Sequence, residues 1–202
     1  MTRPVLRSSP TSPFGRKIKL ALALLGLSDQ VEIHYADTTN PEDSLRQQNP
    51  LGKIPVLVLA DGSSIYDSRV ILEYFDHLAG GGKLIPADPA TRFPALTLAA
   101  LGDGIMDAAL LRRYETMMHE PGCASSKWDE MQSGKIERGL AALEKALPSE
   151  TGLGVGEITV ACALGYLDFR FAGAWRTSHP ELVGWLERFA ARCPGFAATA
   201  PK

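Results

Sequence analysis

Two residue pairs in the first half of the chain could together hold a small peptide-like ligand. Ile54-Pro55 lies just ahead of the apolar run 56–59, so the proline stands at the start of a strand, where it removes no ladder hydrogen bond. An X-Pro bond there could be cis, which would turn the N–H and C=O of Ile54 outward, free to pair with an extended ligand. Asp67-Ser68 precedes a helical apolar pattern, and a helix N-terminus favours a carboxylate.

Ser12 places a hydroxyl at another helix start. Ser12 followed by Pro13 is typical of an N-cap and a first helical residue, and in most proteins such a serine only caps its helix. If a thiol were held there, the hydroxyl and the helix dipole would both stabilise its thiolate. Each unit by which the thiol pKa falls from roughly 8.5 corresponds to about 1.4 kcal/mol. The serine would donate a hydrogen bond and would not be a covalent nucleophile. Ser9 and Thr11 are neighbouring hydroxyls that could take this role instead.

The elements that must position these groups follow from apolar spacing and turn residues. In order they are a strand at 4–7, a helix at 13–25, a strand at 31–36, a short helix at 41–48, strands at 56–59 and 64–66 joined by a turn at Asp61-Gly62, and a helix after Asp67. Val31, Ile33 and Tyr35 should form one face of the second strand. A helical crossover implies parallel pairing and the hairpin implies antiparallel pairing. We therefore expect a mixed four-stranded sheet with helices on both faces.

The second half of the chain shows helical patterns only. The glycine-rich run 79–83 predicts a flexible break, and Asp88-Pro89 begins a new helix. Helices are predicted at 90–120, 127–147, 159–171 and 180–193. We therefore expect an α+β protein with a first domain at 1–79, a linker at 80–89 and an all-helical domain at 90–202.

Composition narrows the class of protein. The 202 residues are 45% hydrophobic and 22% charged, as in ordinary globular proteins, and the net charge of −2 gives no reason to expect nucleic acid as a partner. Cys123, Cys162 and Cys193 are odd in number and widely spaced, which favours a reducing compartment over a disulfide framework. No signal peptide or membrane span is predicted.

The run 49–55, Asn-Pro-Leu-Gly-Lys-Ile-Pro, followed by Asp67-Ser68, resembles the glutathione-binding signature of the glutathione S-transferases. The resemblance covers nearly the whole chain and is to the bacterial serine-type members that are poorly assigned to classes. It implies a thioredoxin-like N-terminal domain, an all-helical bundle after it, glutathione as co-substrate and no metal. It also implies a cytoplasmic homodimer.

The resemblance implies roles for individual residues. Ser12 matches the activating serine of the tau and zeta classes. The glutathione-binding set would be Lys53, Ile54, Pro55, Asp67 and Ser68. In this set Ile54 would pair with the cysteinyl segment, Ser68 with the γ-glutamyl carboxylate and Asp67 with the ammonium, while Lys53 would meet the glycyl carboxylate. Family members often carry Glu where this chain has Asp67, whose reach is shorter.

A second, hydrophobic substrate would lie against a wall carried mainly by the long first helix of the helical domain. The wall residues would be Phe14, Ile105, Met106, Ala109 and Arg113, with Arg112 and Tyr114 beside them. Such a stripe is more often plain core. An apolar wall implies an apolar electrophile, and the two arginines could favour an anionic one.

The predicted function is a glutathione transferase that ionises glutathione at Ser12 and adds it to a hydrophobic electrophile. One alternative is a glutathione-dependent isomerase of the zeta type, although that class carries Ser-Ser-Cys where this chain has Ser12-Pro13-Phe14. The other is a non-catalytic regulatory protein with the same fold, as in the stringent starvation protein. The electrophile itself is not predicted.

Overall fold

The computed structural model describes residues 3–201, which divide by their contacts into two units. One unit contains the chain as far as Arg92 together with the segment that starts at Pro194, and the other is Phe93–Cys193. The chain therefore leaves the first unit and returns to it. The domain boundaries expected from the sequence, 1–79 and 90–202, stay a prediction.

The first unit contains the predicted mixed sheet. Its strands are β1 (Val5–Ser8), β2 (Glu32–Tyr35), β3 (Val56–Val58) and β4 (Ser64–Ile65), in the spatial order β2-β1-β3-β4. β1 pairs parallel with β2 and antiparallel with β3, and β3 pairs antiparallel with β4. The crossover and hairpin arguments are thus confirmed, and the arrangement is the expected thioredoxin-like one.

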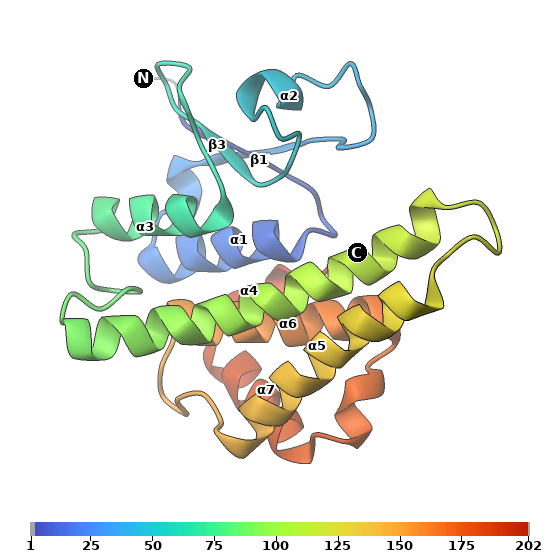
Figure 1. Cartoon of the computed structure of the whole chain (residues 1–202). Helices are drawn as coiled ribbons and strands as arrows, with labels where there is room; N and C mark the ends of the chain where they lie inside the picture. The colour runs from blue at the N-terminus through green and yellow to red at the C-terminus, as the bar shows by residue number, and fades with distance from the viewer. Residues whose placement is uncertain (1–2, 202) are drawn as a thin grey trace. The chain divides into compact units, whose positions relative to one another are not determined.

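Helices cover both faces of this sheet. They are α1 (Pro13–Leu25), η1 (Ser28–Gln30), α2 (Leu45–Gln48), α3 (Ser68–Leu78) and, from the end of the chain, α8 (Pro194–Ala198). Figure 1 shows α1 and α3 side by side on one face and α2 on the other. The core between them is fully buried at Leu6, Ile18, Leu57, Ile71 and Leu72, with Leu45 and Val56 buried on the α2 side.

The apolar face predicted for the second strand is largely exposed. Val31, just before β2, is buried, but all four residues of β2 are exposed, with Ile33 at 53% and Tyr35 at 66%. β2 is an edge strand with a neighbour on one side only. Its apolar alternation therefore does not mark a buried face.

The glycine run after α3 is held rather than free. Gly80, Gly81 and Gly82 all have positive φ, a backbone conformation that suits glycine. The buried Asp76 carboxylate accepts hydrogen bonds from the backbone N–H groups of Gly82, Lys83 and Leu84 at 2.9, 3.0 and 2.7 Å. The flexible break expected here is thus replaced by a turn built around one carboxylate.

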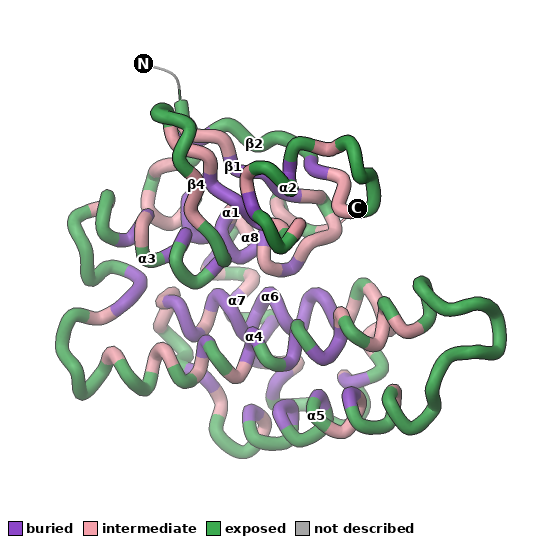
Figure 2. Tube along the Cα trace, turned by 45° about the horizontal axis from the view of Figure 1, so that its top comes forward, coloured by how far each residue is buried: buried purple, intermediate pink, exposed green. Residues whose placement is uncertain are grey.

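The second unit is a helical bundle, as predicted. Its elements are α4 (Pro89–Met118, whose first turn belongs to the first unit), α5 (Ser126–Lys145), α6 (Val155–Phe171), η2 (Ala174–Thr177) and α7 (Pro180–Arg192). α6 is apolar all round and is the most buried of them, and Figure 2 shows it running beside α4. A Cβ on Gly102 of α4 would lie 3.0 Å from Thr159 of α6, so the two backbones approach closely there.

α4 is long and apolar enough to cross a membrane by length and composition alone, and it is the one such helix in the described part of the chain. Core helices pass the same test, and its close approach to α6 is that of a core helix. Aspartate at position 103 of α4 is also buried, at 1% exposure.

We predict that Asp76→Ala strongly destabilises the protein. The change leaves three backbone donors without their acceptor. The donor of Leu84 is buried, and an unsatisfied buried donor costs about 1–3 kcal/mol, whereas water can reach the donors of the exposed Gly82 and Lys83. Urea denaturation should show a loss of about 1–3 kcal/mol in the free energy of unfolding. Asp76→Asn keeps one acceptor oxygen and should lose less. A loss below about 0.5 kcal/mol in Asp76→Ala would contradict this account.

Candidate functional site

Sheet register brings the three predicted groups of the first unit to one edge of the sheet. β3 aligns Val56 with Arg7 of β1, and Leu57 with Ile65 of β4. Continuing both registers places Ile54 opposite the residues just after β1 and opposite the start of α3. Because α1 and α3 run in the same direction, as Figure 1 shows, both helices begin at this edge. Ser12, Ile54 and Ser68 are thereby gathered.

Ser12 caps α1 in the way the sequence predicts. Its backbone is extended, and its Oγ accepts a hydrogen bond from the N–H of Gly15 at 3.1 Å. A hydroxyl that accepts in a cap keeps its own proton for another partner. The rival hydroxyls of Ser9 and Thr11 lie 3.4 Å from each other and form a weak mutual contact. Ser12 as the activating hydroxyl, in preference to Ser9 or Thr11, stays a prediction.

Gly15 allows α1 to approach the end of β1. A Cβ at this position would overlap the Oγ of Ser8 and lie 3.3 Å from its Cβ. Ser8 is 1% exposed, so its side chain is packed in the interior. The first turn of α1, which carries Ser12, is thus seated directly on the strand end.

Ile54 stands ahead of β3 with its backbone available. The Ile54-Pro55 peptide is cis, as the sequence permits, and the Tyr66-Asp67 peptide is cis as well. No hydrogen bond to the N–H or C=O of Ile54 occurs within residues 3–201. Pro55 is buried and Ile54 is half-buried.

Asn49 shapes the loop that presents Ile54. Its side chain is 2% exposed, donates to the C=O of Lys53 at 2.9 Å and accepts from the N–H of Leu51 at 3.0 Å. Gly52 adopts φ +61° within this turn. Lys53 itself is exposed. The asparagine of the matched motif is therefore a structural residue of the loop.

Arg7 of β1 joins the segment 43–48, which contains α2, to the sheet. Sequence reasoning missed this role. Its guanidinium donates to Ser44 Oγ at 2.9 Å, Gln48 Oε1 at 2.8 Å and Asp43 Oδ1 at 2.8 Å. All three acceptors lie in or just before α2. The sequence did show an arginine at an inward-facing strand position, which indicates a buried polar contact. It could not show the partners, because they are far away in the sequence.

The acidity of Asp43 reflects the same network. The N–H groups of Asp37 and Leu45 donate to its carboxylate and lower its pKa below the usual range, and the charge of Arg7 lowers it further. The Asp43 side chain is only 12% exposed. The segment 37–48 is thus organised around an ionised carboxylate.

Asp67 and Ser68 stand at the start of α3. The Oδ1 of Asp67 accepts from the N–H of Arg69 at 3.0 Å, so Asp67 is the N-cap and Ser68 the first helical residue. Asp67 is exposed, whereas Ser68 is 3% exposed. The carboxylate can face a solvent-borne cation, and the first N–H groups of the helix have no partner within it.

The predicted substrate wall is largely core. Ile105, Met106 and Ala109 are at most 2% exposed, and Ile105 packs where a Cβ on Gly139 of α5 would stand. Phe14 and Arg113 are half-buried. The wall as a substrate site stays a prediction.

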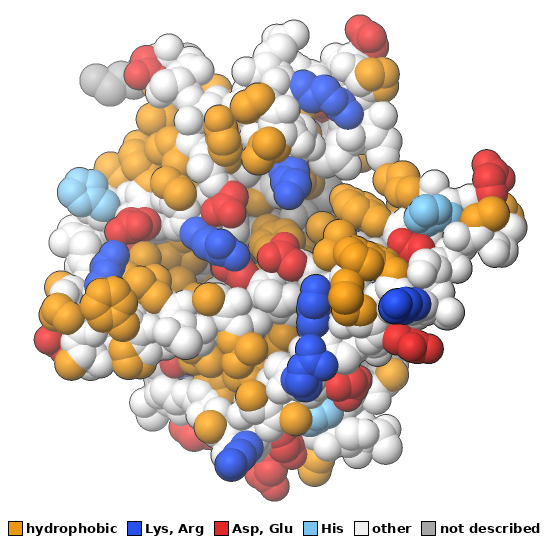
Figure 3. Space-filling view, in the orientation of Figure 1, with side chains coloured by type: hydrophobic (Ala, Val, Ile, Leu, Met, Phe, Trp, Pro, Cys, Tyr) orange, Lys and Arg blue, Asp and Glu red, His pale blue; other side chains and the backbone are white. Residues whose placement is uncertain are grey.

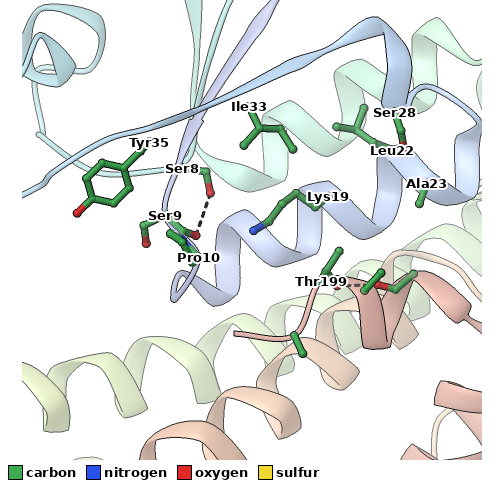
Figure 4. Close-up of a pocket in the computed structure, with 13 residues that line it drawn as sticks. Ser8, Ser9, Pro10, Lys19, Leu22, Ala23, Ser28, Ile33, Tyr35 and Thr199 are labelled. Carbon is green, nitrogen blue, oxygen red and sulfur yellow. Dashed lines mark hydrogen bonds between the residues drawn. The ribbon is translucent and has the colours of Figure 1, made fainter. Parts of the chain in front are cut away.

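A groove of about 570 Å³ lies elsewhere in the first unit and was not predicted. Its lining includes Ile33 and Tyr35 of β2, Lys19 of α1 and Thr199 of the tail, and in Figure 4 Ile33 points toward Lys19. The tail is fixed by Arg16, whose Nη2 donates to the C=O of Phe196 at 2.6 Å and whose guanidinium lies 3.9 Å from the Phe196 ring centre. The end of the chain is therefore fastened one turn from Ser12.

Charge is mixed on the face seen in Figure 3, where acidic and basic side chains are interspersed among hydrophobic ones. Residues 3–201 contain no group of three or more His, Cys, Asp or Glu side chains suited to a metal ion.

Comparisons with known proteins agree with this arrangement. The glutathione S-transferase N-terminal domain matches residues 11–78 and the glutathione S-transferase C-terminal domain matches 108–188. The chain is 37% identical to the GST-like protein YibF of Escherichia coli (strain K12), over 97% of this chain and 98% of that one.

A crystal structure of a glutathione transferase family member from Pseudomonas fluorescens Pf-5 with bound glutathione is 42% identical and has a TM-score of 0.92, covering 98% of this chain and 99% of that one. A structure of a family member from the same organism with bound S-(propanoic acid)-glutathione is also 42% identical, with a TM-score of 0.88, and covers 98% of this chain and 100% of that one.

Acid should reveal the role of Asp43. A lowered folded-state pKa contributes stability that is present above the unfolded value, near 4, and is lost as the pH falls through the folded value. Asp43→Asn should therefore unfold at lower urea concentration than the parent protein at pH 7. The gap should narrow below about pH 4. A constant gap from pH 7 to pH 2 would show that the ionised form contributes nothing.

The close packing of the start of α1 against Ser8 at the end of β1 can be tested with Gly15→Ala. Overpacking of this kind costs about 1–3 kcal/mol, and urea denaturation should show that loss. The double variant Ser8→Ala/Gly15→Ala removes the overlapping Oγ and should recover part of it. If the two changes were simply additive, the contact with Ser8 would not be the cause.

Proposed function

Because this chain belongs to the glutathione S-transferase family, we propose that it is a glutathione transferase whose Ser12 stabilises the glutathione thiolate for addition to a hydrophobic electrophile. The observation that carries the proposal is the geometry of Ser12. Its Oγ already accepts from Gly15, so its proton is free to be donated at the N-terminus of α1. A thiolate placed there gains that hydrogen bond and the favourable end of the helix dipole.

Glutathione binding would use the gathered edge of the sheet. The Ile54 backbone, unpaired within residues 3–201, would hold the cysteinyl segment as an added strand does. The start of α3 at Ser68 would take the γ-glutamyl carboxylate, and the exposed Asp67 its ammonium. Lys53, exposed on the same loop, would meet the glycyl carboxylate.

The chemistry would be an addition or displacement in which the thiolate sulfur attacks an electrophilic carbon. On binding, the thiol proton passes to solvent, and Ser12 holds the thiolate by one hydrogen bond. The sulfur lone pair then forms the S–C bond, while a leaving group departs with its bonding electrons or the adjacent carbon takes a proton from water. Binding of both partners supplies most of the rate through proximity. The S-substituted glutathione held by the Pseudomonas fluorescens relative is a product of this kind and supports the reaction class.

We also infer that the protein works as a homodimer. The first unit leaves large apolar side chains exposed, among them Leu51 (69%), Val70 (50%) and Leu78 (54%). Burial of such residues against a second copy would remove them from water. Light scattering of the full chain measures the stoichiometry directly.

Proton release on glutathione binding is the test of Ser12. If the bound thiol pKa lies about two units below 8.5, roughly 0.8 proton should be released at pH 7.5 and about 0.1 at pH 5.5. Calorimetric titration in buffers of different ionisation enthalpy measures this number. Ser12→Ala should bind glutathione without the release at pH 7.5, whereas Ser12→Thr, which keeps the hydroxyl, should retain it.

Other outcomes are equally informative. Retention of proton release in Ser12→Ala, together with its loss in Ser9→Ala or Thr11→Val, would assign the role to a neighbouring hydroxyl. Failure of the parent protein to bind glutathione at millimolar concentration would overturn the enzyme proposal.

A further inference from the structure

The register of α4 and α6, which run in the same direction, places two arginines at the same level of the two helices. On α4, Leu98 fills the place where a Cβ on Gly156 would stand, and Gly102 approaches Thr159 within 3.0 Å of its would-be Cβ. Equal steps along the two helices keep this register. Eleven residues further, about three turns on each helix, lie Arg113 and Arg170.

An aromatic contact confirms the register at that level. The guanidinium of Arg112 on α4 lies 4.8 Å from the ring centre of Phe171 on α6. Figure 2 shows the two helices side by side along this length.

Arg112 and Arg113 differ in their partners. Arg112 donates to both carboxylate oxygens of Asp129 on α5, at 2.8 and 3.0 Å, and so has a fixed structural pairing. Within residues 3–201 neither Arg113 nor Arg170 forms an ion pair with a carboxylate. The Nε atoms of both are buried and have no hydrogen-bond partner. Only one of the two neighbouring arginines is therefore available to a ligand.

Aromatic side chains border the pair. The Arg170 guanidinium lies 4.3 Å from the ring centre of Phe169 and 5.8 Å from that of Tyr166. Tyr166 is 3% exposed, and its burial raises the pKa of the phenol. The phenol is thus neutral and can donate. Tyr114, one residue beyond Arg113, is 38% exposed.

The cluster consists of positive donors without a negative partner. Two like charges held side by side repel each other, and a buried guanidinium N–H that lacks an acceptor is costly. A carboxylate relieves both, because its two oxygens match the guanidinium fork. The bordering aromatic rings suit an apolar group attached to that carboxylate.

We propose that Arg113 and Arg170, with the Tyr166 hydroxyl, form a binding site for a carboxylate in the helical unit. If the protein is a glutathione transferase as proposed above, the electrophile that it accepts carries a carboxylate on an apolar body. The binding site itself does not depend on that function.

Direct titration tests the site without glutathione. Calorimetry or NMR titration of the full chain should give 3-phenylpropanoate a dissociation constant at least about tenfold lower than that of its neutral amide. Arg113→Gln and Arg170→Gln should each abolish the difference, and Arg113→Lys, which keeps the charge without the fork, should keep part of it. Arg138→Gln removes the same charge from an exposed position of α5 and should change nothing.

Equal binding of the acid and the amide would overturn the proposal. So would a preference for the acid that survives both Gln variants, provided their thermal unfolding shows that they fold.

A second titration separates this inference from the proposed function. S-(2-carboxyethyl)glutathione should bind about tenfold more tightly than S-propylglutathione, and Arg113→Gln should equalise them. Equal affinities in a parent protein that binds glutathione would reject the carboxylate-bearing electrophile and leave the transferase proposal intact. Binding of 3-phenylpropanoate without any binding of glutathione would reject the transferase proposal and retain the carboxylate site.

Discussion

The antiparallel pairing of β3 with both of its neighbours is the constraint on which the first unit depends. β3 is only three residues long, yet its register with β1 and β4 decides which loop residues face each other at the sheet edge. A slip of one residue would exchange the two faces and bury Val58 in place of Leu57. Pro55 ends the hydrogen-bond ladder just before β3, because a proline has no N–H to continue it. Ile54 lies beyond this end.

Charged side chains of low exposure fix, by hydrogen bonds, the connecting segments that make no ladder hydrogen bonds with the sheet. Arg7 and Asp43 join β1 to the segment before α2, and Asp76 gathers the glycine turn after α3. A charge of such low exposure is tolerated only where hydrogen bonds replace its water. Arg7, Asp43 and Asp76 each have several hydrogen-bond partners, although the Nε of Arg7 is buried without one, as are the Nε atoms of Arg113 and Arg170. Arg113 and Arg170 differ from Arg7 because neither has a carboxylate partner within residues 3–201. The contrast separates charges that build the fold from charges left for a ligand.

Local patterns explain why much of this arrangement could be predicted from the sequence. Ser12, Asp67 and the glycine of the hairpin turn act through neighbours within three residues, so their roles follow from caps and turn chemistry. The edge strand shows the limit of such reasoning, because alternation in β2 looks the same whether or not a second layer covers it. Arg7 and Arg16 act through partners 37 and 180 residues away, respectively, and no local pattern announces either.

The return of the tail to α1 has a consequence for synthesis of the protein on the ribosome. Residues 194–201 complete the groove beside α1, and Arg16 holds Phe196. When the sheet first emerges, this face of α1 is bare and Arg16 lacks its carbonyl partner. This face of α1 therefore stays uncovered until the whole helical bundle has been translated. A stop codon just before Pro194 would keep every residue matched by the two glutathione S-transferase domains. It would still remove the tail that packs against α1 and binds Arg16.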